Sequence, residues 1–126
     1  MPLLHHELCF GCGRTNLFGL LLEVEEVAPG AVAGRCFIKQ DHQGADGGRA
    51  HEGVLAGALV DAMGLACGVD ARAVSFEVSV GAPAPVGSFL DVEACVESRD
   101  GSFANSSATA TAEGRIVAKA VGRFRS

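Results

Sequence analysis

A single charged residue, Asp61, lies in the stretch VLAGALVDAMGLACG that covers residues 54–68. A helix turns by about 100° per residue, so this aspartate would share one stripe with glycines and face away from the apolar side. The glycines of this stripe are Gly53, Gly57, Gly64 and Gly68. Glycine inside a helix costs roughly 0.5–1 kcal/mol relative to alanine, which indicates a face that something approaches closely. A carboxylate there is expected to be paired, neutral, or placed to act on a bound molecule.

A second group of reactive side chains stands near the start of the chain. Cys9 and Cys12 have the C-x2-C spacing of a zinc-binding pair, and His5 and His6 could add imidazole ligands. Because the sequence has only one such pair, it favours the interpretation of two buried thiols near the sheet edge, with no metal site. The five cysteines show no disulfide framework, and we expect reduced thiols in the cytoplasm.

The elements that position these residues follow from the period of the apolar positions. A helix is expected over about 52–67, with Leu55, Leu59, Ala62 and Ala66 on its core face. Alternating or apolar runs predict strands at 20–27, 31–39, 74–80, 88–98, 103–112 and 115–124. Residues 1–19 are expected to be irregular. The order β-β-α-β-β-β-β predicts an α+β fold, a single domain over 1–126 with a six-stranded, mainly antiparallel sheet.

Composition excludes several classes of protein. The net charge is −5 and no basic cluster is present, so a nucleic-acid partner is not expected. No apolar run approaches the ~20 residues that span a bilayer, and the start lacks the features of an export signal. One helix cannot cover both faces of six strands, so we expect a homodimer, with a dimer of dimers as a further option.

Four motifs in order carry a family resemblance: CFGCGRTNLFGL at 9–20, DHQG at 41–44, HEGVLAGALVDAMG at 51–64 and PAPVG at 83–87. They are similar to CFxCGxxNPxGL, a HQG loop, HGG followed by a helix with an acid, and PVPVG. The chain thus resembles the hotdog-fold acyl-CoA thioesterases, in the small single-domain branch related to phenylacetate-pathway and 4-hydroxybenzoyl-CoA thioesterases. The best-known members carry the acid nine positions after the motif histidine, which is Val60 here, and Asp61 follows one position later.

The resemblance implies hydrolysis of an acyl-CoA or acyl-carrier-protein thioester to acid and thiol, at a site between two subunits and without a cofactor. A backbone N–H near Glu52 or Gly53 would polarise the carbonyl. Asp61 would serve as general base or nucleophile, Glu52 as an auxiliary acid or base, and Gln43 would orient the thioester or a water. The residues expected to contact substrate are His42, Gly44, His51 and Gly57.

Two alternatives of other classes stay open at this point. The chain would be a non-catalytic acyl-CoA-binding hotdog protein if its acid has moved out of the site. It would be a hotdog dehydratase or hydratase if His51 works with a carboxylate on an intact thioester. Scattered arginines could meet the phosphates of coenzyme A in any of these cases: Arg49, Arg72, Arg99 and Arg115.

Overall fold

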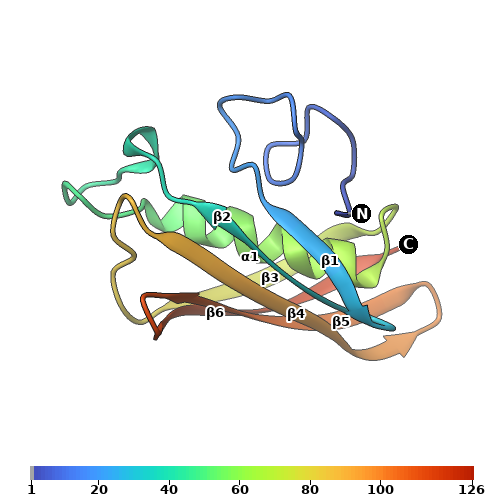
Figure 1. Ribbon diagram of the computed structural model, residues 1–126. Helices are drawn as coiled ribbons and strands as arrows, with labels where there is room; N and C mark the ends of the chain where they lie inside the picture. The colour runs from blue at the N-terminus through green and yellow to red at the C-terminus, as the bar shows by residue number, and fades with distance from the viewer. Residues whose placement is uncertain (1) are drawn as a thin grey trace.

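The sheet and the helix follow the predicted order along the chain. The computed structural model describes residues 2–126 (Figure 1). Its elements are β1 (Glu23–Ala28), β2 (Ala31–Phe37), the short 3-10 helix η1 (Gln40–His42), α1 (Glu52–Cys67), β3 (Arg72–Val80), β4 (Phe89–Asp100), β5 (Phe103–Ala112) and β6 (Arg115–Arg125). The predicted α+β architecture is confirmed.

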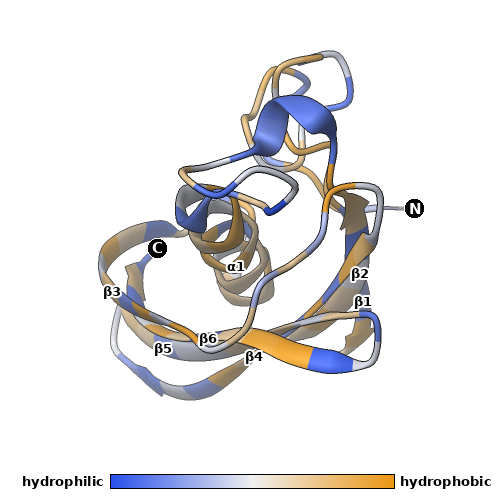
Figure 2. Cartoon of the chain, turned by 90° about the vertical axis from the view of Figure 1, so that its left-hand side faces the viewer, coloured by the Kyte–Doolittle hydropathy of each residue, from blue (hydrophilic) through white to orange (hydrophobic). Residues whose placement is uncertain are grey.

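All six strands belong to one antiparallel sheet with the order β1-β2-β4-β5-β6-β3. The sheet curls around α1, which packs on β2, β3, β4, β5 and β6 across its concave face (Figure 2). Side chains alternate along β5 between the helix side and the outer side of the sheet. Its alanines point inward, toward α1, and its Ser and Thr side chains point outward, with Ser106 an inward-facing exception. Small inward residues let the helix lie close to the sheet, and the core forms between them.

The helix begins and ends at residues with local reasons to do so. His51 is the N-cap, with an extended backbone and a ring nitrogen that accepts a backbone hydrogen bond. At the other end Gly68 has φ +140°, a conformation that favours glycine, and its N–H donates to the Gly64 carbonyl at 3.0 Å. The predicted core face is confirmed as buried: Leu55, Leu59, Ala62 and Ala66.

The glycine stripe of α1 is covered by the irregular segment of residues 5–20, which we call the N-terminal segment. A Cβ on Gly57 would lie 3.5 Å from both Phe10 and Leu20, and one on Gly64 would lie 3.7 Å from the His5 Nε2. These are ordinary van der Waals distances, and Phe124 of β6 lies nearer to Gly64, at 3.4 Å, so the segment packs on this face without an approach that requires glycine.

The first strand starts three residues later than the sequence predicted. Leu21 has φ +54°, a left-handed conformation that ends the regular pairing of an extended strand. The flanking N–H groups of Leu20 and Leu22 donate to Phe10 and Gly11 of the N-terminal segment, at 2.7 and 2.8 Å. Residues 20–22 are thus held by the N-terminal segment, while the Leu20 and Leu22 side chains remain in the core.

Strand β3 forms one edge of the sheet and leaves apolar side chains uncovered. It pairs only with β6 among the described strands, and Val74, Phe76 and Val80 are about half exposed. A long apolar edge strand is a template for pairing with another chain. In the part of the chain that the structure describes, no helix is long and apolar enough to cross a membrane.

The fit of the N-terminal segment on α1 leads to a stability prediction at Gly11. A Cβ at this position would lie 2.7 Å from both the Cβ and the Oδ2 of Asp61, so one of the two backbones must shift. We expect Gly11→Ala to lower the free energy of unfolding by about 1–3 kcal/mol, measured by urea denaturation. Gly81→Ala is the control, because a Cβ there meets nothing within 4 Å and needs no left-handed backbone. Equal stability of the two variants would contradict the described packing.

Candidate functional site

The amino end of α1 carries a histidine whose hydrogen position is fixed by its contact. The backbone N–H of Gly53 donates to the Nδ1 of His51 at 2.7 Å. A neutral imidazole that accepts at Nδ1 carries its hydrogen on Nε2. Because His51 is exposed, this ring presents an N–H donor to whatever binds at the helix start.

One backbone donor at the helix start remains available. Val54 and Leu55 N–H both contact the His51 carbonyl, and Gly53 N–H is taken by the His51 ring. Within residues 2–126 the Glu52 N–H has no acceptor. The first N–H groups of a helix lie at the positive end of its dipole and favour negative charge.

A hollow of about 260 Å³ lies beside this helix start. It is lined from the loop before α1 by Gly44, Ala45, Asp46, Arg49 and Ala50, from α1 by Glu52 and Leu55, and from the end of β3 and the following loop by Val80, Gly81, Ala82, Pro83 and Ala84. Glu52 and Arg49 are both exposed there. Two exposed carboxylates, of Asp46 and Glu52, thus share one site with a guanidinium and a free backbone donor.

The DHQG loop supports the helix start through contacts made within the loop. The His51 N–H donates to the His42 carbonyl at 2.8 Å, while the buried His42 ring accepts from the Lys39 N–H at 3.0 Å. Burial lowers the pKa of His42, so its ring is neutral. The amide of Gln43 accepts from Gly48 N–H at 2.6 Å and donates to Gln40 at 2.8 Å. A Cβ on Gly44 would lie 2.8 Å from the His51 Cα, which explains a glycine there.

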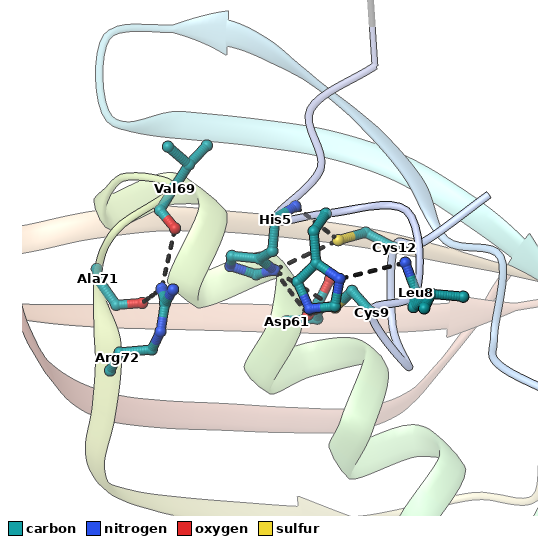
Figure 3. Close-up of polar contacts among 9 residues, drawn as sticks. His5, Leu8, Cys9, Cys12, Asp61, Val69, Ala71 and Arg72 are labelled. Carbon is teal, nitrogen blue, oxygen red and sulfur yellow. Dashed lines mark hydrogen bonds and ion pairs between the residues drawn. The ribbon is translucent and has the colours of Figure 1, made fainter. Parts of the chain in front are cut away.

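A second group of functional side chains meets about two and a half turns further along α1 (Figure 3). His5 Nδ1 lies 3.3 Å from Asp61 Oδ1, and Cys9 Sγ lies 3.4 Å from the same oxygen. The Nδ1 of His5 is also 3.6 Å from Cys9 Sγ and 3.3 Å from Cys12 Sγ. We call these four residues the His5–Asp61 cluster. It borders a pocket of about 270 Å³ that Val60 and the first residues of β3 also line.

The electrostatics of the cluster tie Asp61 to its neighbours. Hydrogen bonds that the His5 ring makes to Asp61 and then to Cys12 raise the pKa of His5 to about 10, so in the absence of other ligands the ring is an imidazolium that neutralises the carboxylate. Burial raises the pKa of the Cys12 thiol. The second oxygen of Asp61, Oδ2, is enclosed, and it has no hydrogen-bond partner among residues 2–126.

The predicted site residues therefore fall into two places. His42, Gln43, Gly44, His51, Glu52 and Gly53 gather at the amino end of α1. Asp61 lies nine residues after Glu52, about 13.5 Å along the helix. Gly57 lies between Glu52 and Asp61, beside Phe10 and Leu20. The contact of His5 with Asp61 was not predicted, although both residues and the glycine stripe were singled out. Of the four arginines, only Arg49 lines the helix-start hollow, whereas Arg99 contacts the Cys67 carbonyl at the other end of α1.

Comparisons with known proteins identify the fold. No protein-family model matches the sequence, and a search of curated proteins gives no match. A mutant of the phenylacetic acid degradation protein PaaI from Thermus thermophilus is 25% identical, with 82% of this chain and 91% of that chain covered and a TM-score of 0.76. A thioesterase superfamily protein has a TM-score of 0.85 at 20% identity, over 95% of this chain and 61% of that chain.

A hypothetical thioesterase from Streptococcus pneumoniae, solved with coenzyme A, has a TM-score of 0.75 at 18% identity, with 82% and 84% of the two chains covered. These similarities cover between 82% and 95% of this chain. The chain therefore has the hotdog fold of thioesterase superfamily and PaaI-type proteins.

Proposed function

We propose that the protein hydrolyses acyl-CoA thioesters at the amino end of α1. The observation that carries this proposal is the unpaired Glu52 N–H at the positive end of the helix, beside a hollow that also holds an exposed carboxylate. The shared fold with thioesterase superfamily proteins supports the reaction class, and the neighbour solved with coenzyme A supports the ligand class. Arg49 at the same hollow would offer a cation to a coenzyme A phosphate.

The chemistry needs donors for the carbonyl and a base for water. The thioester oxygen would accept hydrogen bonds from the Glu52 N–H and the His51 Nε2–H, which stabilise the oxyanion as water adds to the carbonyl carbon. The Glu52 carboxylate would take the proton from that water. When the C–S bond breaks, the electron pair leaves with sulfur, and Glu52 returns the proton to give the free thiol and the acid.

Glu52 fits the role of base better than Asp61 does in this geometry. A general base needs an oxygen within hydrogen-bond reach of the attacking water. The Oδ1 of Asp61 already contacts His5 and Cys9, and its Oδ2 is enclosed within the protein. Glu52 is exposed and lines the hollow where the free backbone donor lies.

One observation favours a second function, the binding of acyl-CoA without turnover. Val60 occupies the position where the best-known thioesterases of the family resemblance carry their acid, and Asp61 is held by the N-terminal segment. In that case the helix start would still bind the thioester carbonyl. Binding of acyl-CoA with no release of thiol by the wild-type protein would establish this second function.

The arrangement of β3 supports a dimer that closes the site. The helix-start hollow touches the last residue of β3, and the pocket beside Asp61 touches its first residues, Arg72 and Ala73. A second copy paired antiparallel along this edge would set the Asp61 pocket of one copy near the helix start of the other. Burial of Val74 and Phe76 would stabilise such a pair.

The catalytic role of Glu52 is tested by Glu52→Gln. We expect kcat for thiol release from an acyl-CoA panel to fall by roughly 10²–10⁴-fold, because the amide cannot accept the proton of water. Free thiol is detected with a chromogenic disulfide reagent. Glu26→Gln, an exposed glutamate on β1 far from the hollow, is the matched control and should keep wild-type activity.

The alternative assignment, with Asp61 as the base, is tested with Asp61→Asn in the same assay. Full turnover in Glu52→Gln together with loss in Asp61→Asn would give the base to Asp61 and contradict the proposed role of Glu52. Absence of thiol release from every acyl-CoA in the wild-type protein would reject hydrolysis.

The dimer is tested by a charge on the open edge. Phe76→Asp is expected to convert a wild-type dimer into a monomer at micromolar concentration, because the carboxylate would have to be buried between two β3 strands. Sedimentation velocity measures the change. Val27→Asp, on the exposed part of β1 at the other edge of the sheet, should remain dimeric. A monomeric wild-type protein, or a Phe76→Asp variant that still dimerises, would contradict this interface.

A further inference from the structure

We propose that the His5–Asp61 cluster is a zinc site, with His5 Nδ1, Cys9 Sγ, Cys12 Sγ and one oxygen of Asp61 as the four ligands. The N-terminal segment supplies three of them and α1 supplies the fourth. This inference is independent of the proposed hydrolysis, because the residues proposed for hydrolysis lie at the amino end of α1 and line a different hollow.

Four of the six distances between the ligand atoms match those around one tetrahedral ion, and the other two are within 4.8 Å. Zinc lies about 2.3 Å from thiolate sulfur and about 2.0–2.2 Å from imidazole nitrogen or carboxylate oxygen, so neighbouring ligand atoms are about 3.3–3.8 Å apart. His5 Nδ1 lies 3.3 Å from Asp61 Oδ1, 3.6 Å from Cys9 Sγ and 3.3 Å from Cys12 Sγ. Cys9 Sγ lies 3.4 Å from Asp61 Oδ1, and all four atoms are within 4.8 Å of one another.

One hydrogen bond at the His5 Nδ1 cannot satisfy all three groups that surround this nitrogen. An imidazole nitrogen has either one hydrogen or one lone pair, directed along a single line in the ring plane. Three groups nevertheless surround the His5 Nδ1 at 3.3–3.6 Å. A metal ion at the centre would satisfy all three, because each ligand then directs its own lone pair to the ion.

Contacts outside the four ligand atoms also suit a zinc–thiolate site. The His5 backbone N–H donates to Cys12 Sγ at 3.2 Å, a contact that stabilises a thiolate. The turn between the two cysteines is closed by the Gly13 N–H, which donates to the Cys9 carbonyl at 2.9 Å. Gly11 leaves room for the Asp61 carboxylate between the cysteines. The enclosed and unpaired Asp61 Oδ2 adds a polar atom that the surrounding protein does not satisfy.

The ligand types indicate zinc and a structural role. Two thiolates with an imidazole and a carboxylate suit zinc rather than magnesium or calcium, which prefer oxygen ligands. Four protein ligands leave no position for water or substrate, which is typical of structural zinc. The ion would fasten the N-terminal segment, which has no helix or strand of its own, to the glycine stripe of α1.

The test measures metal in the full-length protein, purified without a metal-affinity tag and without chelator. We expect close to one zinc per chain by elemental analysis, and cobalt in its place should give the absorption bands of tetrahedral thiolate coordination. Removal of the ion with a strong chelator should lower the Tm by on the order of 10 °C and expose the N-terminal segment to proteolysis, with recovery when zinc is added.

Matched variants separate ligands from neighbours. Cys12→Ser and His5→Asn should lose the zinc, whereas Cys95→Ser and His6→Asn should keep it. Asp61→Asn should weaken zinc binding by on the order of 100-fold, read by competition with a chromophoric chelator. Wild-type protein that neither contains zinc nor binds added zinc would overturn the proposal, as would full zinc content in Cys12→Ser. Unchanged affinity in Asp61→Asn would overturn the four-ligand assignment. None of these readouts depends on thioester turnover.

Discussion

The contact between the N-terminal segment and the glycine stripe of α1 is the interaction on which the rest of the structure depends. Sixteen residues of α1 lie in the curve of the sheet, and only one side of the helix is left for other contacts. Residues 5–20 lie against that side, with Phe10 and Leu20 beside Gly57 and His5 beside Gly64. Asp61, in the middle of the stripe, is the point where the two meet.

This contact divides the exposed side of α1 into two regions with different chemistry. At Asp61 the polar groups are satisfied mainly by each other, and little of the carboxylate reaches solvent, since its side chain is 11% exposed. At the amino end, Glu52 and His51 are exposed and a backbone donor is unpaired. Under the proposed function, an incoming carbonyl would bind at the open, positive end of the helix. The proposed hydrolysis and the proposed zinc site follow from the same division.

Local signals predicted the fold well. The apolar period placed α1 at the residues that the structure shows, and alternation placed the six strands in the correct order. The error at the start of β1 has a specific cause, because Leu20 and Leu22 alternate as in a strand while Leu21 adopts a left-handed backbone to meet the N-terminal segment. Alternation indicates which side chains are buried. It does not indicate which segment accepts the backbone hydrogen bonds of those residues.

The sequence identified the residues of the candidate site, but it did not identify which of them contact each other. The glycine stripe marked the face of α1 that the N-terminal segment covers, but the sequence holds no periodic signal that joins His5 to Asp61, 56 positions apart. The structure brings together these two groups of reactive residues, which the sequence leaves unconnected. At the helix start the sequence pointed to a backbone donor near Glu52 or Gly53, and only the observed His51 cap distinguishes the two.

The most direct measurement is a crystal structure with a ketone analogue of acyl-CoA, in which a methylene group replaces the sulfur and the carbonyl is kept. We expect the carbonyl oxygen to accept a hydrogen bond from the Glu52 N–H, while Asp61 keeps its contacts with His5 and Cys9. A carbonyl bound against Asp61, with the N-terminal segment displaced from α1 and the Glu52 N–H still unpaired, would contradict this expectation.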